Sequence, residues 1–111
     1  MTTSLLNTTL VRDIEPGSYI TRIRTYNEVN IEGRQPYVSV EMLIDDLIVT
    51  DRWYSSRIPY IMKCLRKQYH KDYMDVTLSQ LLNMCKDQDF VVNVSYNAKY
   101  GRQIDYREEV D

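Results

Sequence analysis

The sequence is poor in the residue types that metal sites, phosphate loops and membrane spans require. Its 111 residues include one histidine, two cysteines and three glycines. These few residues leave no metal-ligand spacing and no glycine-rich loop that could cradle a phosphate. No apolar run approaches the roughly 20 residues of a membrane-spanning helix. We therefore expect no metal, no cofactor and no membrane insertion.

The cysteines and the N-terminus bear on the compartment. Cys64 and Cys85 each lie among apolar residues of a predicted helix, so we expect buried free thiols rather than a disulfide. The first ten residues lack the basic start and the long apolar stretch of a secretion signal. The expected location is therefore cytoplasmic.

The rest of the composition is typical of one small globular domain. Hydrophobic residues make up 43% and charged residues 27% of a chain of 111 residues, which is long enough for one core but not for two. We assign residues 1–111 to a single domain, with 1–14 as an N-terminal extension and 108–111 as a short acidic tail. The net charge is −2, yet residues 52–71 carry six basic side chains and no acidic one. A partner would therefore meet a local charge pattern rather than the average.

Residues 37–54 predict a β-hairpin that turns at Asp45 and Asp46. Its apolar face pairs Ile44 with Leu47, Met42 with Val49 and Val38 with Trp53. Its other face pairs Tyr37 with Tyr54 and Ser39 with Arg52. Since strand side chains alternate, one hairpin could serve a core and a ligand at once.

Trp53 lies on the apolar face of this register, where we expect a core residue whose N–H needs a partner. Asp51 lies on the same face, and an unpaired carboxylate is costly in a core. A one-residue slip or a bulge would instead turn Trp53 outward as a stacking surface. We prefer the core placement, and the outward one stays open at this point.

The other elements follow from turn and capping signals. Glu15-Pro16-Gly17 predicts a turn before a strand from Ser18 to Tyr26. Its odd positions, Tyr19, Thr21, Ile23 and Thr25, make the better core face, and its even positions bring Arg22, Arg24 and Tyr26 to the opposite face. Ser55 and Ser56 offer an N-cap for a helix from Ile58, with Pro59 in its first turn. Thr77 and Gln80 form a capping-box pattern that opens a second helix.

Residues 90–96 and 102–107 predict a closing hairpin, with Gly101 in its loop. The order β-β-β-α-α-β-β indicates a mainly β domain. It suits a five-stranded Greek-key barrel, the OB-fold, with a helical insertion between strands three and four. A closed barrel would leave no exposed strand edges. A β-grasp or another α+β sheet would use similar elements.

Several features occur together along residues 15–107. They are Glu15-Pro16-Gly17-Ser18-Tyr19, Thr50-Asp51-Arg52-Trp53-Tyr54, the helix Ile58–Tyr69, the helix start Thr77–Leu82, and Tyr96 followed by Tyr100-Gly101-Arg102-Gln103-Ile104. In pattern and element order the chain resembles a family of small single-stranded-DNA-binding proteins of phages and mobile elements, built on an OB-fold. The resemblance implies sequence-tolerant binding of single strands during DNA replication or recombination, alongside replication or recombination proteins.

A sheet face with aromatic and arginine side chains is a surface on which bases stack. We expect bases on Tyr26, Tyr37 and Tyr54, with Arg22, Arg24 and Arg52 at phosphates or in cation–π contacts. The loops that flank the ligand face of an OB barrel add Arg34, Lys99, Tyr100 and Arg102. The competing interpretation is that tyrosines simply prefer strands, since the chain has ten of them.

Catalysis is not expected, because Asp45 and Asp46 are turn residues and His70 has no nucleophilic partner suggested by the sequence. The alternative to DNA binding is an accessory module that holds a polymerase, primase or helicase and has no nucleic-acid affinity of its own. It would use the basic side of the first helix, residues 63–71. That side could also contact nucleic acid or a second copy of the chain, or simply be solvated.

Overall fold

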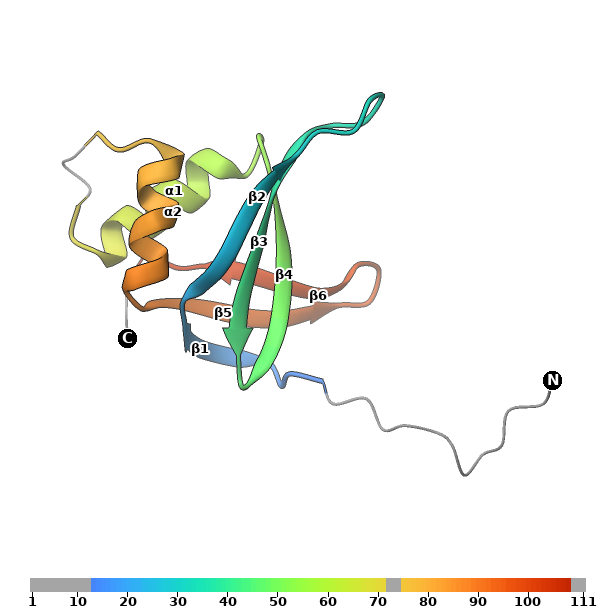
Figure 1. Cartoon of the computed structure of the whole chain (residues 1–111). Helices are drawn as coiled ribbons and strands as arrows, with labels where there is room; N and C mark the ends of the chain where they lie inside the picture. Colours follow the sequence, from blue (N-terminus) through green and yellow to red (C-terminus); the bar gives the residue numbers. More distant parts are fainter. Residues whose placement is uncertain (1–12, 72–74, 109–111) are drawn as a thin grey trace.

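The computed structural model describes residues 13–71 and 75–108 and shows two three-stranded antiparallel sheets with two helices. The elements are β1 (Gly17–Thr21), β2 (Ile23–Val29), β3 (Tyr37–Ile44), β4 (Leu47–Tyr54), α1 (Ile58–Gln68), α2 (Leu78–Asp87), β5 (Phe90–Asn97) and β6 (Gly101–Tyr106). One sheet has the order β1-β5-β6 and the other β2-β3-β4. The sheets pack across one another, with both helices gathered at one side (Figure 1). The prediction of a mainly β domain with two helices is therefore confirmed.

The first predicted strand is in fact two strands, because the chain bends at Arg22. β1 pairs with β5, and β2 pairs with β3, so one continuous segment contributes to both sheets. The Thr21 hydroxyl, beside the bend, donates a 2.7 Å hydrogen bond to the carbonyl oxygen of Leu43. The expected five strands thus become six.

The β3–β4 hairpin has the predicted register along its whole length. Asp45 and Asp46 both have positive φ, 50° and 65°, the conformation of the type I′ turn that suits twisted hairpins. Ile44 lies opposite Leu47 and Val38 opposite Trp53. The turn chemistry and the alternating pattern were therefore sufficient to place this hairpin.

A bulge at Arg24 changes the facing of β2. The pairing with β3 shifts between Ile23 and Thr25, and an extra residue in one strand reverses the facing of those after it. Ile23 is buried as predicted, but Thr25 is exposed and Tyr26 packs against the core. The expected faces of Thr25 and Tyr26 are therefore wrong.

Trp53 lies in the core with no exposed surface. Its Nε1 donates to the Tyr106 hydroxyl at 2.8 Å, and that hydroxyl donates to Asp51 Oδ2 at 2.9 Å. The Trp53 and Tyr106 rings also meet edge to face, 5.2 Å between centroids. Because Asp51 has these partners, its carboxylate is tolerated on the inner face and the register needs no slip. The core placement of Trp53 is confirmed.

The expected closed barrel does not form through backbone pairing in the part of the chain that the structure describes. β4 and β6 belong to different sheets, with no ladder between them. Side chains connect them instead, through the chain from Trp53 to Tyr106 to Asp51. The six strands therefore enclose one core while remaining two sheets.

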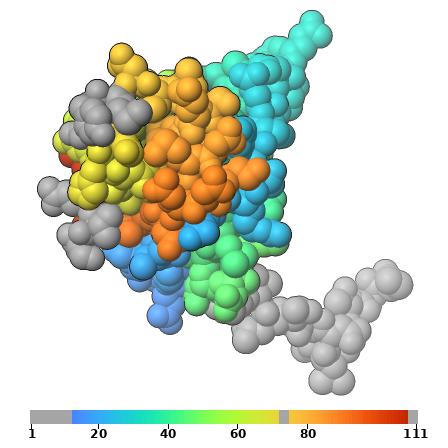
Figure 2. All heavy atoms as spheres, turned by 60° about the vertical axis from the view of Figure 1, so that its left-hand side comes forward, coloured from blue at the N-terminus to red at the C-terminus, as the bar shows by residue number. Residues whose placement is uncertain are grey.

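The helices cover one side of this core. Figure 2 views that side and shows α2 lying beside β2, where the Tyr26 hydroxyl donates to Asn83 Oδ1 at 2.9 Å. Thr77 and Gln80 form the predicted capping box. The predicted cap of α1 is wrong, because its N-cap is Arg57, without a side-chain cap, rather than Ser55 or Ser56. Both cysteines are buried and free, as expected.

Gln68 joins α1 to the β5 strand. Its Oε1 accepts from the Val91 N–H at 2.8 Å, and its Nε2 donates to the Val91 carbonyl at 2.9 Å and to the Arg107 carbonyl at 2.6 Å. The β5–β6 pairing reaches Val92 opposite Tyr106. One side-chain amide therefore satisfies the β5 backbone just beyond that point, where an unpaired group would be costly.

Replacing Tyr106 by Phe should destabilise the fold by about 1–3 kcal/mol, because Trp53 and Asp51 each lose their buried partner. Urea unfolding measures this change in the free energy of unfolding. Tyr100→Phe removes a hydroxyl from a side chain that is 69% exposed and serves as the matched control. Equal midpoints for the two variants would contradict the bridging role of Tyr106.

Stability should fall in alkali. Burial raises the pKa of Cys85 from 9.0 to about 11 and that of Tyr106 well above 10. In alkali the unfolded chain releases thiol and phenol protons that the folded chain retains. The contribution of these groups to the free energy of unfolding is therefore complete only below the pKa of the unfolded thiol. The contribution of Cys85 declines as pH rises through the interval between 9.0 and about 11, and that of Tyr106 declines above 10. Urea unfolding across this range should show the decline, and Cys85→Ala should show a shallower one. An unchanged slope in Cys85→Ala would contradict this assignment.

Candidate functional site

The outer face of the β2-β3-β4 sheet carries a cluster formed by Tyr37, Arg52 and Tyr54, called here the tyrosine–arginine cluster. Tyr37 lies opposite Tyr54 and Ser39 opposite Arg52, the predicted pairs. The two tyrosine rings are tilted by 50° with centroids 5.3 Å apart. The Arg52 guanidinium carbon lies 4.9 Å from the centre of the Tyr37 ring. Two rings and a cation therefore share one open surface.

A surface depression of about 410 Å³ lies at this cluster. Ile31, Arg34 and Gln35 complete its lining, and all three belong to the β2–β3 loop that projects from the body in Figure 1. The volume is within the range of small-ligand pockets, about 300–1,000 Å³. The depression can therefore accept a flat group against the rings, with a loop along its edge.

The electrostatics of this depression are one-sided. Its lining includes two guanidinium groups, Arg34 and Arg52, and no carboxylate. Among residues 13–71 and 75–108, neither arginine forms an ion pair. The pKa of Arg52 is raised, first by its hydrogen bond to Tyr54 and then by interaction with the phenol of Tyr37. The site is suited to an anion or to a ligand rich in acceptors.

Three predicted site residues lie elsewhere or have other partners. Arg22 pairs with Asp89 at 2.5 Å, and Arg24 pairs with Glu41 at 3.2 Å. Tyr26 contacts α2 through Asn83. The break in the strand at Arg22 and the bulge at Arg24 explain why Arg22 and Tyr26 do not join the cluster, as alternation along one continuous strand had predicted. Arg24 reaches the outer face of β3, but there it pairs with Glu41.

Lys99 and Tyr100 form the tip of the β5–β6 hairpin. Their backbone N–H groups donate to Asn97 Oδ1 at 2.8 and 3.3 Å, and the Lys99 ammonium lies 5.2 Å from the Tyr100 ring centre. The Tyr100 side chain is 69% exposed. The tip thus repeats the pairing of a ring with a cation, but neither residue lines the depression at the tyrosine–arginine cluster.

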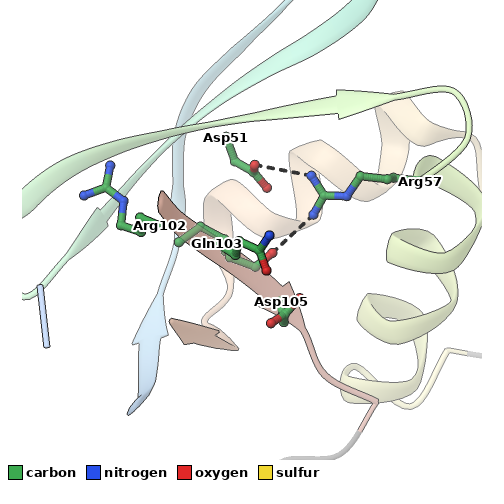
Figure 3. A pocket seen from close by; sticks show the side chains of 6 residues that line it. Asp51, Arg57, Arg102, Gln103 and Asp105 are labelled. Atoms are coloured by element: carbon green, nitrogen blue, oxygen red, sulfur yellow. Dashed lines mark hydrogen bonds and ion pairs between the residues drawn. The ribbon is translucent and has the colours of Figure 1, made fainter. Parts of the chain in front are cut away.

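Arg102 lines a second depression, of about 350 Å³, between β4 and β6. Arg57 dominates it, donating to Asp51 Oδ1 at 3.4 Å, to the Arg52 carbonyl at 3.1 Å and to the Ile104 carbonyl at 3.2 Å. Figure 3 shows this guanidinium between the two strands, with Arg102 extending away from it. Arg57 thus bridges β4 and β6. Asp51 and Asp105 also line the hollow, and their negative charges make it less suited to a phosphate group.

The basic side of α1 is partly neutralised by Glu108. Lys63 and Lys67 pair with the two oxygens of Glu108 at 3.3 and 3.2 Å. The pKa of Glu108 is lowered, first by the hydrogen bond from Lys67 and then by that from Lys63. This acidic partner weakens the case for α1 as a phosphate-binding surface.

The sequence interpretation missed Ile31 and Gln35. Both belong to the polar connection before Tyr37, and the nearness of Gln35 to Tyr37 along the chain was the one available signal. No cluster of three metal-ligating side chains occurs within the described residues. None of the helices in those ranges has the length and hydropathy needed to cross a membrane.

Comparisons with protein-family models, with curated proteins and with solved structures find no match to this chain. We therefore base the functional proposal on the geometry of the tyrosine–arginine cluster.

The neighbouring arginines Arg52 and Arg57 should respond differently to substitution. Arg57→Met should cost about 1–2 kcal/mol of unfolding free energy, because it removes the hydrogen bonds that join β4 to β6. Arg52→Met should leave the urea midpoint unchanged, since its guanidinium lies on the outer face. A large loss of stability in Arg52→Met would mean that this residue serves the fold rather than a ligand.

Proposed function

We propose that the chain binds single-stranded DNA on the outer face of the β2-β3-β4 sheet. The observation that carries the proposal is the cross-strand pair Tyr37–Tyr54 with Arg52 over one ring, at an open depression. Bases stack on the tyrosines, and Arg34 and Arg52 meet phosphates or base edges. Each stacked base contributes about 1–3 kcal/mol to the binding free energy. Stacking tolerates any sequence, because every base has a π-face.

We further propose that the two sheets are a form of the OB-fold. The support is the bent first segment, β1 and β2, which pairs with β5 on one side and β3 on the other. In an OB-fold, the second and third strands form the ligand face. The loop between strands one and two and the loop between strands four and five flank it. Here those strands are β3 and β4, and the loops are 30–36 and 98–100. Arg34, Lys99 and Tyr100 lie in these loops.

Because the chain has a small negative net charge, we expect electrostatic attraction to contribute little to DNA binding. The net charge of −2 gives no general attraction to nucleic acid, so affinity depends on local cations and stacking. Binding to single strands weakens with salt by about 0.7 logarithmic units per phosphate contact. We expect a shallow salt slope and a residual affinity at high salt.

The cellular role that we propose is replication or recombination of a phage or mobile element, without catalysis. The support for this role is the family resemblance of residues 15–107. Replication or recombination proteins would then be further partners.

An accessory module that holds a replication protein through α1 is the second candidate. The observation that favours it is Tyr60, an α1 side chain that is 59% exposed beside the basic residues Lys63 and Lys67. Aromatic residues are enriched where proteins meet. In this case Lys63→Glu with Lys67→Glu would abolish partner capture, and DNA binding would be absent in the unmodified chain.

The test of DNA binding is fluorescence anisotropy of a labelled oligothymidine, titrated with the protein over a salt series. Tyr37→Ala with Tyr54→Ala should weaken binding by about 1–3 kcal/mol per lost stacked base, with a similar salt slope because the phosphate contacts remain. Circular dichroism checks that the variant stays folded.

Tyr60→Ala is the matched control, since it removes an exposed tyrosine from α1 and should leave the affinity unchanged. If the double variant bound as tightly as the unmodified chain, the site assignment would fail. If the unmodified chain did not bind even at low salt, DNA binding would be excluded and the accessory role favoured.

A further inference from the structure

We propose that the depression at the tyrosine–arginine cluster prefers keto bases, guanine, thymine and uracil, over the amino bases adenine and cytosine. This inference rests on the proposed function and adds a base preference at one position of an otherwise sequence-tolerant surface. Its basis is the hydrogen-bonding chemistry of the six residues that line the depression: Ile31, Arg34, Gln35, Tyr37, Arg52 and Tyr54.

The charged groups of this lining are all donors. Arg34 and Arg52 carry guanidinium groups, which donate hydrogen bonds and accept none. No Asp or Glu lines the depression, so no carboxylate is available to accept from the exocyclic amine of adenine or cytosine. At the exocyclic position an amino base would therefore direct N–H groups toward cations, whereas a keto base would direct a carbonyl oxygen toward them.

Gln35 adds the one amide of the lining. Its Nε2 donates to the Ser55 hydroxyl at 3.5 Å, which turns the amide nitrogen toward that residue. The amide oxygen is thus the end left for a ligand donor. Guanine, thymine and uracil each carry a ring N–H next to a carbonyl, so an arginine donor and an amide acceptor side by side match that edge.

The loop that carries these groups has a defined turn. The Arg34 N–H donates to the Ile31 carbonyl at 3.0 Å, and Gly33 has φ of 80°, a conformation that favours glycine. Pro36 then fixes the backbone before Tyr37 enters β3. The turn therefore holds Arg34 and Gln35 in fixed positions beside the tyrosine rings. A base preference requires such fixed positions.

The experiment compares a deoxyuridine oligomer with a deoxycytidine oligomer of the same length by fluorescence anisotropy. The two bases have the same size and differ by a carbonyl against an amine, so stacking and phosphate contacts are matched. We expect deoxyuridine to bind about fivefold tighter, the lower end of what one base-edge contact discriminates, since the depression is open to solvent.

Two charge-reversal variants test the position of the preference. Arg34→Glu replaces a donor by an acceptor within the depression. It should reduce the ratio of the affinity for the deoxyuridine oligomer to that for the deoxycytidine oligomer to one or below. Lys99→Glu makes the same charge change at the β5–β6 hairpin tip and should weaken both oligomers by the same factor. The affinity ratio is the readout, so a general loss of phosphate attraction does not affect the conclusion.

The outcomes separate this inference from the proposed function. Equal binding of the two oligomers would overturn the base preference and leave single-strand binding intact. Binding of neither oligomer at low salt would overturn both. A preference that survives Arg34→Glu would overturn its assignment to this depression.

Discussion

The hydrogen-bond chain from Trp53 through Tyr106 to Asp51 is the constraint on which the rest of the structure depends. It joins two sheets that share no backbone ladder between β4 and β6. Buried polar groups of this kind stabilise only when every member has a partner, and here the indole N–H, the phenol and the carboxylate satisfy one another. Arg57 completes the bridge by binding both Asp51 and the Ile104 carbonyl.

This inner constraint also positions the outer face of β4. Asp51 and Trp53 point inward, so period-two alternation directs Arg52 and Tyr54 outward. A slip of one residue would exchange the two sets of β4 and move Arg52 and Tyr54 into the core, away from Tyr37. The bridge that holds the sheets together therefore fixes the surface at which we propose that bases stack.

Five of the described basic side chains pair with acids, whereas two line the depression at the tyrosine–arginine cluster. Arg22, Arg24 and Arg57 pair with Asp89, Glu41 and Asp51, and Lys63 and Lys67 share Glu108. Arg34 and Arg52 line a depression without acids. A net charge close to zero can thus coexist with a local excess of donors, because these five paired cations are neutralised by acids and the two arginines of the depression are not.

The sequence by itself determined the β3–β4 register, the Thr77–Gln80 capping box and the pairing of Tyr37 with Tyr54, because each depends on residues close together in the chain. Only the tertiary structure decided the split of the first strand at Arg22, the bulge at Arg24 and the contribution of Gln35 to the depression. Those features depend on which distant strands pair with β1 and β2 and on the contact of the β2–β3 loop with the end of β4, where Gln35 meets Ser55. Periodicity carries no information on such contacts, since a bulge preserves the residue pattern while reversing the faces that follow it.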